Sequence, residues 1–479
     1  MNNTLGQLLI RERIISADQL TIALEQQRAT GQRLGEAMVE LGFISADDLI
    51  RFFQSTPPKP RNVAQCGLSE TFLIDLLLKI AFFHGQTFTL DDMSRQLCLP
   101  VAVVDELAGL AKTDRLVTVR SGGSYSRMSY IFALTDMGIE RAQNALLISQ
   151  YAGAAPVPLA AYQLMVAHQS VRQVSVDAAV IRKALGQLVI SDELLAQLGP
   201  AFNSGRSIFL YGPSGTGKSA IAEALGNALE GNVFVPYAVE VDQQVIRLFD
   251  PAVHRSIDGR DHAKETLDID EAVMHDPRWV VCHRPVVLVG GELGISGLDL
   301  DYDSDAKFYE APPHMKAANG VFILDDFGRQ RVPPQQLLNR WIVPLERGTD
   351  FLELHTGKKL EIPFDQITVF CTNLKPGDLV DDAFLRRIRH KVEIAYQSEA
   401  QFLEILRRVC AANGIDYVES AAHHLVEEHY RKLPRPFVGS HPRDLVDQII
   451  DRARYAKVKP GLTVEAIDAA AANYFVTMH

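Results

Sequence analysis

The feature that most constrains the fold is a glycine-rich turn between an apolar strand and a helix, in the stretch SIFLYGPSGTGKSA (207–220). The turn has the form Gly-x4-Gly-Lys-Ser, and the helix-forming run IAEALGNALE follows it. Glycines allow successive backbone N–H groups to converge on one anion, because no side chain intrudes. The N-terminus of the following helix adds partial positive charge. This strand, loop and helix form a complete P-loop and predict an α/β domain that binds a nucleoside triphosphate.

The loop also predicts which residues contact ATP and Mg²⁺. The ammonium of Lys218 would reach the β- and γ-phosphates, and the hydroxyl of Ser219 would coordinate Mg²⁺. The other expected nucleotide contacts come from the loop itself, at Gly212, Pro213, Ser214, Gly215, Thr216 and Gly217.

Two further apolar strands are expected to end in polar side chains. The run 321–324 is followed by Asp325 and Asp326, and the run 366–373 ends in Asn373. An acid at the carboxyl end of such a strand suits Mg²⁺ coordination beside the P-loop. A second acid can polarise the attacking water. The sequence therefore predicts a hydrolytic site rather than a simple phosphate cradle.

Arginines follow these motifs at two places. The segment AFLRRIRHKVEI (383–394) concentrates three of them, and HPRDL (441–445) places Arg443 at a helix start. This order of motifs resembles the AAA+ ATPase superfamily over about residues 170–479. The stretch 305–348, and two expected strands around Gly357, resemble the MoxR-like branch, which carries a hairpin before its sensor 1 strand.

The resemblance implies a role for each motif. Asp325 would organise Mg²⁺, Asp326 would activate the water, and Asn373 would orient that water as sensor 1. Arg443 would contact the nucleotide from a C-terminal lid.

The resemblance also implies an arginine finger, which acts on the ATP of a neighbouring subunit. Arg389 matches the finger best by its distance from the following strand, and Arg386 is the second candidate. Hydrolysis would then require a homo-oligomeric ring, hexameric in most of the superfamily. The chain departs from the family at Asp326, where glutamate is usual. The carboxylate then lies about 1.5 Å short, which predicts slow or conditional hydrolysis, or a nucleotide-binding switch.

The N-terminal residues 1–55 contain two copies of a helix–turn–helix pattern, offset by 29 positions and sharing ISAD at 15–18 and 44–47. Ser16 with Gln19 fits a capping box. The copies resemble the N-terminal domain of type II secretion and type IV pilus ATPases, some of which bind cyclic di-GMP. Arg33 is retained in the second copy, but Thr4 replaces it in the first, which removes one guanidinium partner for a phosphate. Cyclic di-GMP binding and docking of a protein partner both remain open.

Residues 68–148 are expected to form a winged helix, with helices joined at Pro100 and a hairpin around Gly122 and Gly123. This fold invites a DNA-binding interpretation. However, residues 68–142 hold nine acidic and seven basic side chains, and DNA binding depends on neutralising phosphates. Arg120, Lys112 and their basic neighbours keep DNA binding open, whereas the composition favours docking of a protein.

The whole chain of 479 residues is therefore expected to be multidomain. We expect an all-α tandem-repeat domain (1–55), a linker (56–67), an α+β winged helix (68–148), a second linker (149–165), an α/β P-loop AAA+ core with a parallel sheet (166–395) and an α-helical lid (396–479). The net charge of −11 argues against nucleic-acid binding through bulk charge.

The composition also bears on location and on metal binding. No segment has about 18 uncharged apolar residues, so we expect no membrane insertion. Five widely spaced cysteines without a CxxC pair indicate neither disulfides nor structural zinc, and the chain is expected to be cytoplasmic. The histidines at 254, 262, 275 and 283 lack metal-binding spacing.

These features predict an oligomeric AAA+ ATPase that remodels or chaperones a protein client, and the first domain points to secretion or pilus systems. The sequence does not identify the client. One alternative is a nucleotide-switched regulator that binds DNA through the winged helix. Another is a cyclic di-GMP receptor with the ATPase as its output.

Overall fold

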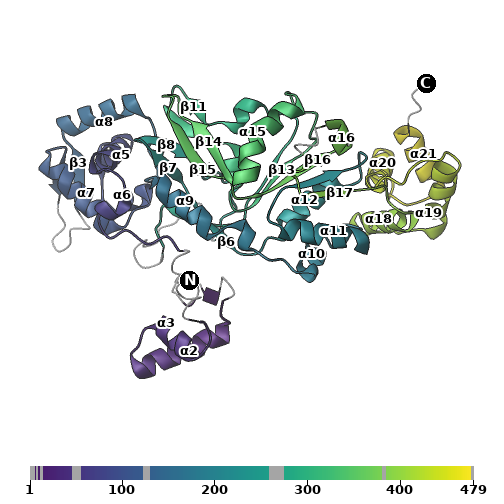
Figure 1. Ribbon diagram of the computed structural model, residues 1–479, viewed down its shortest axis with the longest axis horizontal. Coiled ribbons are helices and arrows are strands. Elements are labelled where there is room, and N and C mark those ends of the chain that lie inside the picture. The colour runs from purple at the N-terminus through teal and green to yellow at the C-terminus, as the bar shows by residue number, and fades with distance from the viewer. Residues whose placement is uncertain are drawn as a thin grey trace.

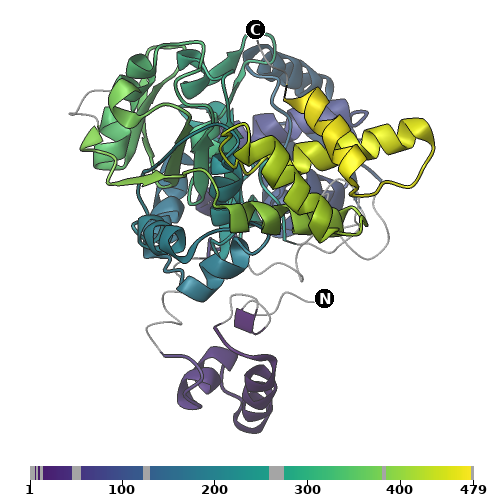
Figure 2. The ribbon, with the colours of Figure 1, turned by 90° about the vertical axis from the view of Figure 1, so that its right-hand side faces the viewer.

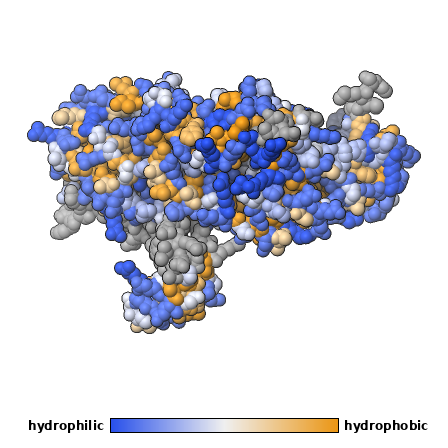
Figure 3. All heavy atoms as spheres, in the orientation of Figure 1, coloured by the Kyte–Doolittle hydropathy of each residue, from blue (hydrophilic) through white to orange (hydrophobic). Residues whose placement is uncertain are grey.

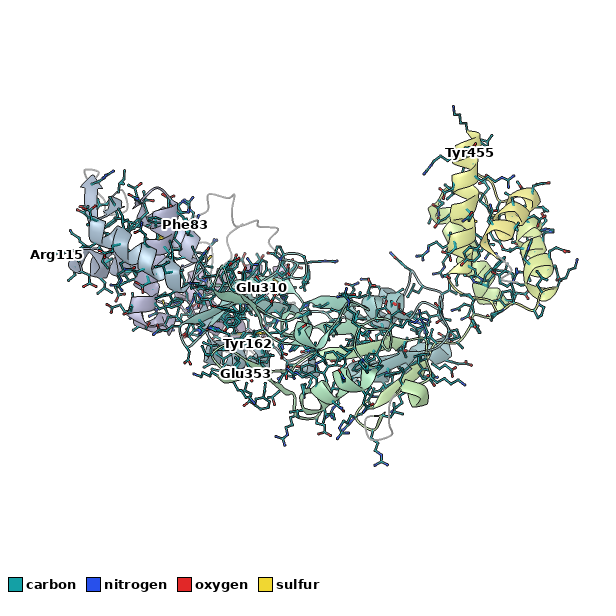
Figure 4. All side chains as sticks on the ribbon, turned by 90° about the horizontal axis from the view of Figure 1, so that it is seen from above. Phe83, Arg115, Tyr162, Glu310, Glu353 and Tyr455 are labelled. Atoms are coloured by element: carbon teal, nitrogen blue, oxygen red, sulfur yellow. The ribbon has the colours of Figure 1, made fainter. Side chains whose placement is uncertain are left out.

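The computed structural model describes residues 6, 9–10, 14–45, 56–121, 130–257, 275–379 and 385–475. Residues 68–148 lie at one end of the long axis and the C-terminal helices at the other, with the larger β-sheets between them (Figure 1). Arg115 and Tyr455 mark these two ends when the molecule is seen from above (Figure 4).

The central sheet has five strands in the order β10-β13-β16-β5-β17, and every neighbouring pair is parallel. The strands are β5 (Ile208–Tyr211), β10 (Val286–Val289), β13 (Val321–Leu324), β16 (Ile367–Thr372) and β17 (His390–Glu393). A parallel sheet is covered on both faces, which explains why these strands are continuous apolar runs. The parallel sheet predicted for residues 166–395 is confirmed.

Helices cover both faces of this sheet. Ile208 and Leu210 pack with α10 (Ala178–Ala184), α11 (Asp192–Asn203) and α12 (Lys218–Gly226). Phe209, which points the other way, packs with Trp341 of α15 (Pro334–Arg347). Successive side chains of a strand point to opposite faces, so three consecutive residues of β5 contribute to two separate cores. The result is a three-layer α/β/α arrangement.

A second sheet, which the sequence analysis did not predict, is built mainly from the chain between α12 and β13. Its order is β11-β12-β8-β7-β4, and a separate antiparallel pair joins β6 to β9. Their bounds are β4 (Val157–Pro158), β6 (Asn232–Pro236), β7 (Ala238–Val241), β8 (Gln244–Arg247), β9 (Trp279–His283), β11 (Asp301–Asp303) and β12 (Phe308–Glu310). Figure 4 shows Tyr162 and Glu310 within this middle part of the molecule.

The hairpin expected around Gly357 is confirmed. Strands β14 (Thr349–Glu353) and β15 (Lys359–Pro363) pair antiparallel, and Gly357 has φ 84° in the connecting turn. Together with α9 (Leu159–His168), the hairpin packs on the core of the second sheet. The remaining short helices nearby are η3 (Val171–Gln173), η4 (Ile295–Leu298), α14 (Pro313–Lys316) and α16 (Pro376–Leu379).

Residues 68–148 form helices around a small three-stranded sheet of order β1-β3-β2. The elements are α5 (Glu70–Phe83), β1 (Thr87–Phe88), α6 (Leu90–Leu97), α7 (Val101–Thr113), β2 (Val117–Ser121), β3 (Ile131–Leu134) and α8 (Asp136–Ile148). The hairpin turn expected at Gly122 and Gly123 lies outside the described residues. The winged-helix assignment therefore stays a prediction.

The segments expected to be linkers are instead partly packed into the structure. Residues 56–67 include η1 (Ala64–Cys66), and residues 149–165 contain β4 and the start of α9. Arg278, only 4% exposed, donates from Nη1 to the carbonyl oxygens of Cys66 (2.9 Å) and Pro156 (3.1 Å), and from Nη2 to Asp276 (2.7 Å). The composition of both segments is typical of linkers. However, the buried guanidinium of Arg278, which is distant in the sequence, donates a hydrogen bond to a backbone carbonyl of each segment.

The C-terminal helices form a separate bundle with its own apolar core (Figure 2). They are α18 (Glu399–Ala412), α19 (Glu419–Val426), the π-helical turn η5 (Glu427–Arg431), α20 (His441–Ala456) and α21 (Val464–Tyr474). At the other terminus, α2 (Ala17–Thr30) packs on α3 (Leu34–Glu40), and the capping box of Ser16 with Gln19 is confirmed. Residues 46–55 of the second repeat lie outside the described residues, so the tandem-repeat assignment stays a prediction.

Within the described ranges, no helix is long and apolar enough to cross a membrane. Hydrophilic residues cover most of the face in Figure 3, and apolar ones are scattered among them.

We predict that Arg278→Ala lowers the free energy of unfolding by about 3–5 kcal/mol, because it leaves the buried carboxylate of Asp276 without its partner. Denaturant unfolding of the full chain would measure this. The control is Arg182→Ala, whose pair with Asp192 is exposed on both sides and should contribute about 0.5 kcal/mol or less. Equal effects of the two substitutions would contradict the structural role given to Arg278.

Candidate functional site

The P-loop connects β5 to α12 and depends on its glycines for its shape. Gly212 has φ 143°, and a Cβ there would lie 2.2 Å from the carbonyl oxygen of Ile394. Gly215 has φ 76°, in the left-handed region that side chains disfavour. The chain can therefore turn tightly at the carboxyl end of β5 and present its backbone at the start of α12.

Lys218 lies at the first position of α12 and is 7% exposed. Its ammonium donates to the carbonyl oxygens of Gly212 (2.9 Å) and Pro213 (2.7 Å) and to Oδ1 of Asn373 (2.7 Å). Burial lowers the pKa of Lys218. The three donors of the ammonium are thus satisfied by oxygens at one edge of the sheet.

Ser219 contacts the acid at the end of β13. Its hydroxyl lies 2.7 Å from both carboxylate oxygens of Asp325. These are hard oxygen donors, side by side at the start of a helix, which is the ligand chemistry that Mg²⁺ prefers. The two predicted metal ligands are therefore brought together, and the donor set fits the ion.

Asp326 follows in a left-handed conformation with φ 47°, which aspartate tolerates better than most residues. Its Oδ1 accepts from Nδ2 of Asn373 at 3.2 Å, and its side chain is exposed. Asn373 therefore joins Lys218 on one side to Asp326 on the other. Gln330, which the sequence analysis missed, donates to the carbonyl oxygen of Asp325 at 3.1 Å and fixes the turn. A glutamine five residues beyond the acid carries no recognisable sequence signal.

The C-terminal helical bundle, the expected lid, touches the loop directly. The backbone N–H of Ser440 donates to the carbonyl oxygen of Gly215 at 2.9 Å. A Cβ on Gly215 would lie 2.7 Å from Ser440 Oγ and equally close to Val438 Cγ1. Arg443 lies three residues further on, in the first turn of α20, with a side chain that is 70% exposed. The structure therefore places Arg443 near the loop without joining it to the Lys218 network.

One of the two candidate finger residues, Arg389, lies at the opposite edge of the sheet. Arg389 directly precedes β17, where His390 pairs with Ile208 and Glu393 pairs with Tyr211. The loop begins beyond Tyr211, so the length of the strand, about 10 Å, separates Arg389 from the chain's own P-loop. Arg386 and Arg389 are exposed and have no ion-pair partner among the described residues. In contrast, Arg387 pairs with Glu346 at 2.6 Å.

Comparison with known proteins identifies one domain and several distant structural similarities. A domain of unknown function, DUF8689, matches residues 398–473, which comprise most of the C-terminal helical bundle. No curated protein sequence matches the chain.

Among solved structures, NtrX from Brucella abortus in complex with ADP is 14% identical with a TM-score of 0.37, covering 71% of this chain and 66% of NtrX. The Thermotoga maritima RuvB Holliday junction branch migration motor is 10% identical with a TM-score of 0.32, covering 63% of this chain and 72% of RuvB. The chain thus spans just under two thirds of NtrX.

We predict that Gly215→Ala weakens nucleotide binding roughly tenfold, because overpacking against Ser440 and Val438 costs about 1–3 kcal/mol. Titration with a fluorescent ATP analogue would measure the affinity. Gly357→Ala is the matched control, since Gly357 has φ 84° but nothing within 4 Å of an added Cβ. It should cost about 1–2 kcal/mol of stability from backbone strain and leave nucleotide affinity unchanged. Unchanged affinity in Gly215→Ala would show that the lid contact does not shape the site.

Proposed function

We propose that this protein is an ATPase of the AAA+ type, which hydrolyses ATP at the subunit interfaces of a homo-oligomeric ring. The observation that carries the proposal is the pair of contacts at the carboxyl edge of the parallel sheet. One joins Ser219 to Asp325, and the other links Lys218 through Asn373 to Asp326. The P-loop, the acids and the polar end of β16 come from distant parts of the sequence and converge at one place.

The residues present fit a Mg²⁺ ion that accompanies ATP. The Ser219 hydroxyl and the Asp325 carboxylate would hold it, directly or through its water shell, and the ion would neutralise charge on the phosphates. When phosphate arrives, Lys218 has a stronger acceptor than the two loop carbonyls that it contacts here. We therefore expect its ammonium to turn from these carbonyls toward the nucleotide.

Asp326 is the group that we assign to activation of the water. Its carboxylate is exposed, so a water molecule can reach it, and Asn373 restrains it from the neighbouring strand. Aspartate is shorter than the glutamate usual at this position. The left-handed backbone at Asp326 changes the direction in which the side chain leaves the main chain. The carboxylate is therefore directed differently than it would be from an extended backbone.

An arginine from a neighbouring subunit completes the proposed site. Arg389 lies at the edge of the sheet away from its own P-loop, and Arg386 precedes it by three residues in the same segment. An exposed guanidinium at that edge is suited to a second copy's nucleotide rather than its own. Ser440, just before α20, donates a hydrogen bond to Gly215 of the loop. A change of the loop between nucleotide states would therefore move α20 and Arg443.

The N-terminal modules would recruit the protein client that such a ring remodels, and the first domain's resemblance points to secretion or pilus systems. One observation favours this function over the DNA-binding alternative. Glu106 of α7, the expected recognition helix, accepts from the backbone N–H of Val63 at 2.9 Å. The backbone N–H of Ala155 donates to Leu97 just before the turn into α7. The chain itself occupies part of the surface that DNA would need. Cyclic di-GMP binding stays a prediction.

We predict that Asp326→Asn lowers ATP turnover about 10²–10⁴-fold, since it removes the general base. Nucleotide affinity should be retained, because asparagine preserves the shape of the side chain. Steady-state phosphate release and equilibrium nucleotide binding would measure the two quantities. Lys218→Ala is the comparison, and it should abolish binding itself. Undiminished turnover in Asp326→Asn would remove Asp326 from the reaction.

A mixing experiment tests whether the arginine acts in trans. Chains that carry both Arg386→Ala and Arg389→Ala should lose about 10³–10⁵-fold in turnover, as should Lys218→Ala chains. Mixed together, they should regain activity. A Lys218→Ala chain keeps its arginines and would supply them to the P-loop of a neighbouring chain that carries Arg386→Ala and Arg389→Ala. Arg387→Ala, whose guanidinium is engaged by Glu346, is the control and should stay active. A mixture no more active than its separate components would contradict a finger supplied in trans.

A further inference from the structure

Two histidines and an aspartate converge in the lid, away from the P-loop. Nε2 of His424 and Nε2 of His429 each lie 2.7 Å from the same oxygen, Oδ1 of Asp468. One ligand atom from each of the three side chains lies within 4.8 Å of the others. His424 belongs to α19, His429 to η5 and Asp468 to α21, so the cluster joins separate helices of the bundle.

The π-helical turn brings the two histidines onto one side. In an α-helix, five residues turn through about 500°, which would leave His424 and His429 about 140° apart. The chain instead widens at η5, where the N–H of Lys432 donates to the carbonyl oxygen of Glu427, five residues earlier. Hydrogen bonding of this spacing lowers the turn per residue, so His424 and His429 lie closer to one face than an unbroken α-helix would place them. Such turns are rare and occur frequently at functional sites.

The donor set and its surroundings suit a divalent transition metal. Neutral imidazole nitrogens favour Zn²⁺ and its neighbours over Mg²⁺, and a carboxylate supplies a third ligand. The side chains are 26% (His424), 18% (His429) and 48% (Asp468) exposed, so water can enter and complete the coordination. Glu428 and Glu465 add negative charge nearby, since each carboxylate interacts electrostatically with His424.

The two histidine–aspartate separations need only a small adjustment to hold the ion. With bonds of 2.0–2.2 Å, two ligands of a tetrahedral zinc lie about 3.3 Å apart. The present 2.7 Å separations are therefore about 0.6 Å too short. Asp468 is half exposed, and a modest rotation of its side chain opens that space. Without a metal, the same carboxylate oxygen accepts hydrogen bonds from both imidazoles.

We propose that His424, His429 and Asp468 form a Zn²⁺ site with at least one coordination position left to water. The ion would fasten the α19–η5 segment to α21. Helix α20, which begins beside the P-loop, packs on α21, so the site would brace the part of the lid that contacts the loop. This proposal does not depend on the proposed ATPase activity.

Metal titration of the full chain tests the proposal. Chelator-treated, nucleotide-free protein would be titrated with Zn²⁺, and with Co²⁺ as a spectroscopic probe, in excess Mg²⁺ to occupy the oxygen donors at Ser219 and Asp325. We expect one equivalent to bind, and the Co²⁺ complex to show visible absorption. His424→Gln, His429→Gln and Asp468→Asn should each weaken binding at least about tenfold.

His423→Gln is the matched control, because His423 is the adjacent residue in α19 but faces Glu419 instead of Asp468. It should bind zinc as the unaltered chain does. X-ray absorption of the zinc-loaded, unaltered protein gives a readout independent of the folding of any variant, and should show two imidazoles with oxygen ligands. The proposal is overturned by no stoichiometric binding, by sulfur ligands, or by equal losses in the His423 control and the three variants.

Discussion

The parallel alignment of β13, β16 and β5 is the constraint on which the site depends. Parallel strands end at one edge of a sheet, so residues separated by more than a hundred positions meet there. The ammonium of Lys218 then bonds to Asn373, and the hydroxyl of Ser219 bonds to Asp325. A register shift of one residue in β13 or β16 would turn Asp325 or Asn373 toward the opposite face, and its contact would be lost.

The C-terminal helical bundle adds a second constraint, because it contacts the loop through backbone and side chain at once. Gly215 accepts from Ser440 and has no room for a Cβ. A loop that rearranges on binding phosphate must therefore move the start of α20 or lose this contact. The proposed zinc site lies further along the same bundle and would stiffen it. The glycine-rich loop and the C-terminal bundle are in this way physically connected.

The sequence predicted most of the site, because its parts have local signatures. A glycine-rich turn after an apolar strand, and acids after another, are recognisable without knowledge of distant contacts. The second sheet was missed because its strands are short, and their pairing depends on segments far apart. The packed linkers were misjudged, since only the distant Arg278 reveals their contacts. His424 and His429 gave no metal signal, because a spacing of five is unfavourable for two ligands on an α-helix.

The most direct test of the central claim is the ATP turnover per chain, measured across a range of protein concentrations alongside the molecular mass in solution. A site completed by a neighbour's arginine predicts that turnover per chain rises as the chain assembles and reaches a plateau when assembly is complete. Turnover that is the same for isolated chains and assembled ones would contradict the account, since each chain would then hold every group that hydrolysis needs.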